Sequence, residues 1–344
     1  MVIFSIIGAL IGAGFASGQE MYLFFYKFGI NGIFGLVLCS SLIGIIIYKT
    51  FNIIYKNEKI RNYQDFLNVV FYKGKEPRNK YLNLSYISNI IVNIFLLITF
   101  YIMISGFGAY FEQEFKISKY IGAAILATIS FFILIKDIQG VAKTNSIIVP
   151  ILILVIGIIG IQNIKNIKFS SISMTNDFNW ILQAIVYCSY NMILVIPVLV
   201  GLKDYLKSKR QIIFISIFSG IIVFILAISI FMLLTNINEN FETIQMPAVY
   251  AITINYPAFR LIYGIVILLS IFSTAISIGI SFLKNISKDK KSYPQIVSIM
   301  CISAVIISNV GFAKLVQMLF PVFGYLGILQ NLYILKRFDN VNIR

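Results

Sequence analysis

Glu20 is the only acidic residue that lies well inside an apolar segment of this sequence. It follows a glycine-rich stretch, Ile11–Gln19, near the middle of the first apolar run. Glycine favours irregular backbone, and a break in a helix exposes N–H groups that attract anions and carbonyl groups that attract cations. This pattern predicts a ligand site formed by Gly12, Ala13, Gly14, Phe15, Ser17 and Gly18. The same glycines also fit two GxxxG motifs, Gly8/Gly12 and Gly14/Gly18, for which close helix packing is the alternative interpretation.

A carboxylate within a membrane span costs about 2.5–3.5 kcal/mol, so such a residue usually lines a pathway or pairs with a partner. Gln19 and Glu20 are therefore predicted to act in gating or ion coupling. Structural pairing near the outer end of the span is the alternative.

A second polar group lies in the sixth apolar segment, at Tyr187, Ser189 and Asn191, followed by Pro197. Proline removes one backbone hydrogen bond, which predicts a break in this segment as well. These side chains are candidates for substrate binding, and hydrogen bonding between helices is the alternative.

Ser270, Ser273, Thr274 and Ser277 are spaced so that they share one face of a helix. Their hydroxyl and carbonyl oxygens, with carbonyls of Gly12 and Phe15, could coordinate a hard cation such as sodium. Ser and Thr are also common at helix contacts in membranes, which is the alternative.

Composition places all of these residues in a membrane protein. Of the 344 residues, 59% are hydrophobic and only 12% are charged, whereas soluble proteins average about 25% charged residues. The net charge of +15 comes from clusters between apolar runs, which indicates membrane orientation and not nucleic-acid binding. The chain has no histidine, and Cys39, Cys188 and Cys301 form no CxxC pair. We therefore expect no enzyme activity, no cofactor and no metal other than a coupling Na⁺, with H⁺ as the alternative coupling ion.

The apolar runs predict ten membrane-spanning helices. They cover residues 2–27, 30–49, 84–110, 120–136, 141–161, 180–202, 211–235, 258–284, 293–311 and 312–335. With both termini in the cytoplasm, 21 of the 28 Lys and Arg residues fall on the inner side and 7 on the outer side. Because positive residues in short loops stay inside, we expect this orientation in the plasma membrane.

Ten spans divide into two sets of five, and an odd number per set gives the two sets opposite orientations. We predict an all-α protein with a first repeat at 1–161, an outer linker at 162–179, an inverted second repeat at 180–335 and a cytoplasmic tail at 336–344. The inner loop 49–83 is basic and contains an amphipathic stretch. The outer loop 236–257 is apolar enough to form a short lid helix, or simply to fill space.

The string IGAGFASGQE at Ile11–Glu20, followed by Phe24-Phe25 and Phe28-Gly29, closely resembles the opening motif of the YkvI-like membrane proteins. That family is similar to the amino acid, polyamine and organocation (APC) superfamily, which has the LeuT-type fold. The resemblance implies broken helices one and six, and a segment Gly12-Ala13-Gly14-Phe15 that binds a substrate carboxylate. It also implies that Ser270 supplies a carbonyl to a sodium site, and Ser273 and Thr274 their hydroxyls.

These observations together predict a cation-coupled secondary transporter of a small zwitterionic or organic solute, such as an amino acid. Its partners would be the lipid bilayer and the solute. The alternative is a membrane sensor or partner subunit that has kept a transporter fold without transport, with the basic 49–83 loop as its docking surface.

Overall fold

The computed structural model describes residues 2–72, 83–136, 140–163, 178–237, 239–286 and 292–337. These ranges are almost entirely helical. Seven of their helices are long and apolar enough to cross a membrane: α4 (Ile30–Lys56), α6 (Leu84–Phe115), α9 (Asn179–Gly201), α10 (Lys209–Leu234), α12 (Arg260–Ile286), α13 (Tyr293–Ile307, with the turn that follows) and α14 (Phe312–Arg337). The chain is therefore a multi-helix membrane protein.

Three further parts of the chain complete the apolar helices. α7 (Lys119–Lys136) and α8 (Gly140–Asn163) contain shorter apolar stretches. The first predicted span is divided into α1 (Val2–Leu10), α2 (Ala13–Ala16) and α3 (Gln19–Phe24). The other nine predicted ranges are thus mainly helical where they are described, whereas the number of spans and the inverted repeats stay predictions. The predicted linker residues 164–177, the loop residues 73–82 and the tail residues 338–344 lie outside the described ranges.

Several helix ends differ from the predicted ones because the polar residues there continue the helix. α4 extends to Lys56 and α6 extends to Phe115, beyond the apolar runs that predicted them. The ninth and tenth predicted spans are nearly contiguous in the sequence. Gly311, whose φ is +96°, separates α13 and the turn after it from α14.

The predicted break in the sixth segment is wrong, because α9 is one uninterrupted α-helix from Asn179 to Gly201. Its only glycine stands at its last position, so no glycine inside it favours a non-helical backbone. Pro197 lies inside α9 without ending it. Membrane helices tolerate proline where neighbouring groups compensate for the lost hydrogen bond.

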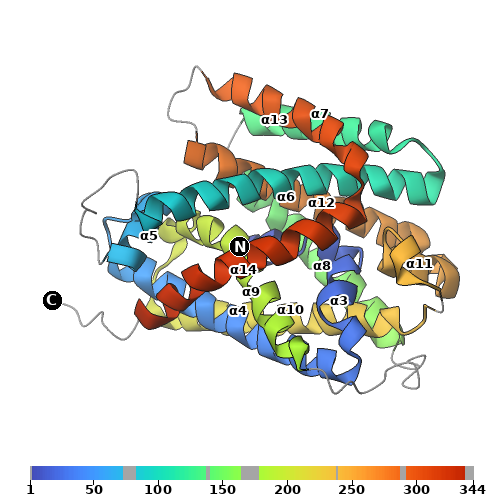
Figure 1. The fold of residues 1–344 in the computed structure, drawn as a ribbon, viewed down its shortest axis with the longest axis horizontal. Helices are drawn as coiled ribbons and strands as arrows, with labels where there is room; N and C mark the ends of the chain where they lie inside the picture. The colour runs from blue at the N-terminus through green and yellow to red at the C-terminus, as the bar shows by residue number, and fades with distance from the viewer. Residues whose placement is uncertain are drawn as a thin grey trace.

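Two short helices lie at opposite ends of the bundle. α5 (Tyr63–Tyr72) packs near the start of α6, and α11 (Pro247–Asn255) packs near its far end (Figure 1). The predicted amphipathic stretch of the inner loop and the predicted lid segment are therefore both helical. The long α6 connects the two ends.

The core is formed by α9, which packs against both α4 and α14, and by α12, which packs against α6 and α8. Gly324 and Gly327 make the contact between α14 and α9 possible, since a Cβ at either position would collide with Val186 or with the Ser189 carbonyl. The outer faces of the helices expose large apolar side chains, such as Phe214, Ile217 and Ile221 on α10. Lipid tails cover such faces in a membrane.

Candidate functional site

The site is organised by the break in the first apolar segment. Helical structure stops at Leu10, and Gly12 has an extended backbone, with φ −97° and ψ −167°. It stops again at Gly18, whose φ of +83° is a left-handed conformation that favours glycine. The predicted break in the first span is therefore present. The segment between the two glycines forms the single turn α2.

α12 provides side-chain donors for the carbonyl groups that the break frees. Ser270 Oγ donates to Ile11 O at 2.6 Å, and Thr274 Oγ1 lies 2.9 Å from Gly8 O and 3.0 Å from Ile11 O. All four residues are buried. Four oxygen atoms, from α1, the break and α12, thus meet at the first end of the break.

Two carbonyls predicted as cation ligands have other partners in this structure. Gly12 O accepts from Ala16 N at 3.0 Å, and Phe15 O accepts from Gly18 N at 3.0 Å. The carbonyls that face α12 are those of Gly8 and Ile11, which sequence reasoning missed. The positions of Gly8 and Ile11 just before the expected break could have indicated these carbonyls, because the last carbonyls before a helix break have no intrahelical donor.

Ser273 lies next to this oxygen cluster on α12. It is buried, and its carbonyl accepts a hydrogen bond from Ser277 Oγ at 2.8 Å. Gly12 fits tightly beside the cluster, since a Cβ there would lie 3.1 Å from Thr274 Cγ2 and 3.2 Å from Met103 Sδ. A larger residue at position 12 would push α12 and α6 away from the break.

Tyr263 makes a third contact between α12 and the broken segment. Its hydroxyl donates to Ala16 O at 2.6 Å, and its side chain is only 2% exposed. Sequence reasoning missed this residue as well, because Tyr263 lies outside the serine and threonine pattern that indicated the face of α12.

Glu20 lies at the outer edge of the break and is 3% exposed. Tyr187 of α9 donates a hydrogen bond from its hydroxyl to Glu20 Oε2 at 3.1 Å. The other carboxylate oxygen lies against Gly14, where a Cβ would collide with it. The structure therefore brings together Gly14, Glu20 and Tyr187, three of the predicted site residues.

The other predicted residues of α9 point elsewhere. Asn191 Nδ2 donates to the Tyr187 carbonyl within its own helix, at 2.9 Å. The carbonyl of Ser189 lies against Gly327 of α14. These bonds and contacts fit the structural alternative for both residues as closely as they fit ligand binding.

An aromatic cluster surrounds Glu20 and Tyr187. The rings of Phe24, Tyr187 and Tyr190 lie 5.2–5.5 Å apart in all three pairs, measured between centroids. Phe320 of α14 stacks on Tyr190 at 4.7 Å. Sequence reasoning assigned no binding role to Phe24, Tyr190 or Phe320, because aromatic residues are frequent throughout this chain.

The loop that contains α11 closes the outer side of the break. Gln19 Nε2 donates to Ile244 O at 2.7 Å and to Gln245 O at 3.0 Å, and Ala248 N donates to Ser17 O at 2.7 Å. A Cβ at Gly18 would lie 3.0 Å from Ala248 N, so only glycine allows this approach. This placement fits both the lid interpretation and the filling of space, so the lid stays a prediction.

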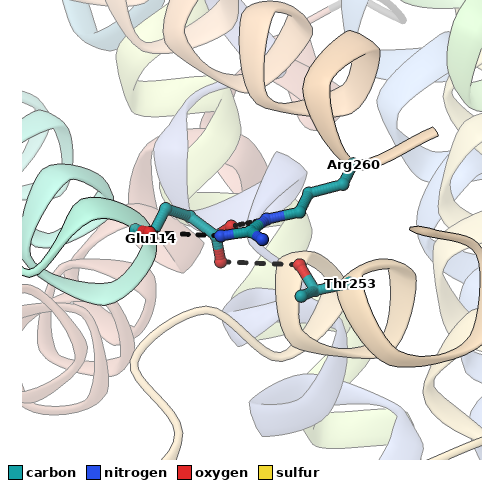
Figure 2. Close-up of polar contacts among 3 residues, drawn as sticks. All are labelled: Glu114, Thr253 and Arg260. Carbon is teal, nitrogen blue, oxygen red and sulfur yellow. Dashed lines mark hydrogen bonds and ion pairs between the residues drawn. The ribbon is translucent and has the colours of Figure 1, made fainter. Parts of the chain in front are cut away.

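An ion pair attaches the lid region to the end of α6 (Figure 2). Arg260 Nε lies 2.7 Å from Glu114 Oε2, and Thr253 Oγ1 of α11 lies 3.5 Å from Glu114 Oε1. The Arg260 side chain is 48% exposed, and that of Glu114 is 5% exposed. Glu114 therefore connects α6, α11 and α12 at the outer end of the bundle.

At the inner end, α5 turns its apolar face toward the bundle. Tyr63, Phe66 and Leu67 are buried, and the Tyr63 hydroxyl donates to Gln330 Oε1 at 2.9 Å. Burial raises the pKa of Tyr63 well above its ordinary value, so this hydroxyl stays a donor at neutral pH.

Two proteins of Bacillus subtilis (strain 168) are similar to this chain over nearly its whole length. The uncharacterized membrane protein YkvI is 26% identical over 337 residues, which cover 94% of this chain and 92% of YkvI. The uncharacterized protein YyaD is 25% identical over 334 residues, which cover 96% of this chain and 93% of YyaD. The resemblance to YkvI-like proteins at Ile11–Glu20 is thus confirmed along the chain. No protein-family model matches the sequence.

Solved structures show which fold this is. The chain superimposes on MhsT, crystallised in complex with L-phenylalanine, with a TM-score of 0.62 and 15% identity, over 99% of this chain and 92% of MhsT. It superimposes on Mhp1, a nucleobase-cation-symport-1 family transporter with bromovinylhydantoin bound, with a TM-score of 0.60 and 14% identity, over 96% of this chain and 74% of Mhp1. The fold is therefore LeuT-like, as the resemblance implied.

Proposed function

We propose that this protein is a secondary transporter that moves a small organic solute across the cell membrane by alternating access, driven by Na⁺. The observation that supports this most directly is the meeting of Gly8 O, Ile11 O, Ser270 Oγ and Thr274 Oγ1 at a helix break. The LeuT-like fold supports it independently. Each charge that crosses 100 mV contributes about 2.3 kcal/mol to such transport.

The oxygen cluster suits a hard monovalent cation. Its donors are two backbone carbonyls and two hydroxyls, without a carboxylate or a sulfur atom, and oxygen ligands select hard ions. The hydroxyl hydrogens now point at the carbonyls. A cation would turn them outward, so that all four oxygens and those of Ser273 could face the ion.

The proposed solute site lies next to the cation site, along Gly12, Ala13, Gly14, Phe15, Ser17 and Gly18 and the facing residues Tyr187, Ser189 and Asn191. Amino acids are the first solute class to test. Gln19 donates to the loop that contains α11, and the Glu20 carboxylate contacts Gly14, which supports a role for both residues in gating or ion coupling. Both termini are proposed to be cytoplasmic, on the evidence of the charge distribution.

Thermal unfolding of the purified protein tests the cation site. We expect Na⁺ to raise the melting temperature relative to K⁺ at equal ionic strength, and Thr274→Val to abolish this increase. Thr99→Val is the matched control, because Thr99 is also buried but donates to Phe95 O within its own helix. A sodium-independent melting temperature in the unmodified protein would contradict sodium coupling.

Uptake into proteoliposomes tests coupling and separates Na⁺ from H⁺. A Glu20→Gln variant is expected to change the pH or cation dependence of uptake. An unchanged dependence would remove Glu20 from the coupling mechanism. If no solute is taken up in any gradient, the sensor alternative is favoured.

A further inference from the structure

We propose that Glu20, Tyr187, Tyr190 and Phe24 form a recognition site for a protonated amine on a solute that has no carboxylate of its own. The proposal rests on the proposed transport function and narrows its substrate class. It disfavours the amino acids that the glycine-containing segment alone would indicate.

The first observation is a buried carboxylate that has no cationic partner. Glu20 is 3% exposed, and in the described ranges no Lys or Arg forms an ion pair with it. The Tyr187 hydroxyl donates a single hydrogen bond at 3.1 Å. Burying a charge without a counter-charge is costly, so a ligand that brings a positive charge would relieve this cost.

The second observation is the set of aromatic rings beside this carboxylate. Phe24, Tyr187 and Tyr190 are at most 2% exposed, and their centroids lie 5.2–5.5 Å apart. The Tyr190 hydroxyl is buried and lies beside the Glu20 carboxylate. Aromatic faces attract cations within about 6 Å of the ring centroid. A carboxylate beside three rings is therefore suited to an ammonium group with an apolar substituent.

The third observation is the position of the Glu20 carboxylate against Gly14. This carboxylate fills the space where a Cβ at Gly14 would lie. It therefore adjoins the Gly12–Phe15 segment, which the YkvI-like resemblance implies for a substrate carboxylate. A second carboxylate placed there would meet a like charge across a low-dielectric gap, which is unfavourable.

The rings contact one another in this structure, so an amine has to separate them to enter. Tyr190 also stacks on Phe320, at 4.7 Å, and Phe320 belongs to α14. Ligand binding is therefore expected to move α9 and α14 relative to the broken segment.

Matched solutes test the proposal on the full-length protein in detergent. Within each set, the solutes share a carbon skeleton and differ in whether they carry an α-amino group, a carboxylate or both. One set is phenethylamine, L-phenylalanine and 3-phenylpropanoate. A second is n-butylamine, L-norvaline and pentanoate, and a third is 1,4-diaminobutane, L-ornithine and 5-aminopentanoate. Calorimetry should show that in at least one set the carboxylate-free amine binds about tenfold more tightly than its amino acid. This is the difference expected from one unfavourable contact between the solute carboxylate and Glu20. The proposal is overturned if in every set the amino acid binds as tightly as its amine, or if no amine binds.

Variants then locate the binding site. Glu20→Gln removes the charge at nearly constant volume and should weaken amine binding on the order of 10- to 100-fold, the effect of a hydrogen bond to a charged group. Glu112→Gln is the control, because Glu112 is an exposed carboxylate on α6. Tyr190→Leu removes one ring and should weaken binding by roughly three- to tenfold, as expected for one cation–π contact. Equal amine affinity in all of these variants would also overturn the proposal.

The outcome can be distinguished from failure of the transport proposal. Binding of amines without any uptake supports the recognition site and contradicts transport. Sodium-dependent uptake of amino acids, with no binding of amines, contradicts the recognition site and supports transport.

Discussion

The broken first segment and the continuous α9 both lie in the core of the bundle and are in contact with each other, yet their backbones differ. Residues 2–24 form three short helices separated at Gly12 and Gly18, whereas α9 runs for 23 residues without interruption. Both carry polar side chains in an apolar surrounding. The difference between them lies in where their polar backbone groups find partners.

In the broken segment, other helices supply those partners. Tyr263, Ser270 and Thr274 of α12 donate to the carbonyls of Ala16, Ile11 and Gly8. In α9, the partners come from within the helix, as Asn191 donates to the Tyr187 carbonyl one turn earlier. The comparison shows that irregular backbone persists inside a membrane protein where a neighbouring helix carries hydrogen-bond donors beside the freed carbonyl groups.

The largest expected effect is at Gly18. Gly18→Ala places a side chain in a left-handed conformation, which alone costs about 1–2 kcal/mol, and pushes against Ala248 N. We expect a clear fall in the melting temperature. The control is Gly201→Ala in α9, where a Cβ meets nothing within 4 Å and should change the free energy of unfolding by less than about 1 kcal/mol. Equal melting temperatures for the two variants would mean that the break is not required.

A smaller loss is expected for Tyr263→Phe. This change removes the side-chain donor to the Ala16 carbonyl and should lower the free energy of unfolding by about 0.5–1.5 kcal/mol. Tyr120→Phe removes a hydroxyl bond at an exposed position and should cost less. Chemical denaturation of both variants gives the comparison. A larger loss at Tyr120 would contradict the view that α12 stabilises the break.

Pro197→Ala tests whether α9 is continuous in solution. If α9 is one helix, alanine restores a backbone donor and should leave the melting temperature unchanged or raise it. If a break existed at this position, alanine would remove the residue that starts a new helical segment, and the melting temperature would fall. A fall would therefore restore the original prediction for the sixth segment.

The smallest effect is expected for Arg260→Gln at the lid. The guanidinium is half exposed, and such ion pairs contribute about 0.2–1 kcal/mol. Stability should hardly change, whereas cleavage of the α11 loop by an added protease should become faster if Glu114 attaches the lid. An unchanged rate of cleavage would show that the hydrogen bonds of Gln19 and the backbone contact to Ser17 are sufficient to hold the α11 loop in place.

The sequence was enough to predict the class of protein and the location of the first break. Long apolar runs require helices, because a backbone in lipid must satisfy its own polar groups. The cluster of glycines indicated where the break lies, and at Gly18 the left-handed backbone, with φ +83°, is one that glycine adopts at little cost. The serine and threonine spacing on α12 likewise identified the correct helix face, since helical periodicity depends only on position along the chain.

Only the tertiary structure decided which atoms meet. Gly8 and Ile11, rather than Gly12 and Phe15, turn their carbonyls toward Ser270 and Thr274, because the direction of a carbonyl depends on how far each helical turn continues. The continuity of α9, and the placement of Glu20 between Gly14 and two tyrosines, also depend on packing between distant segments. Such contacts join residues more than 150 positions apart, and local sequence patterns carry no information about them.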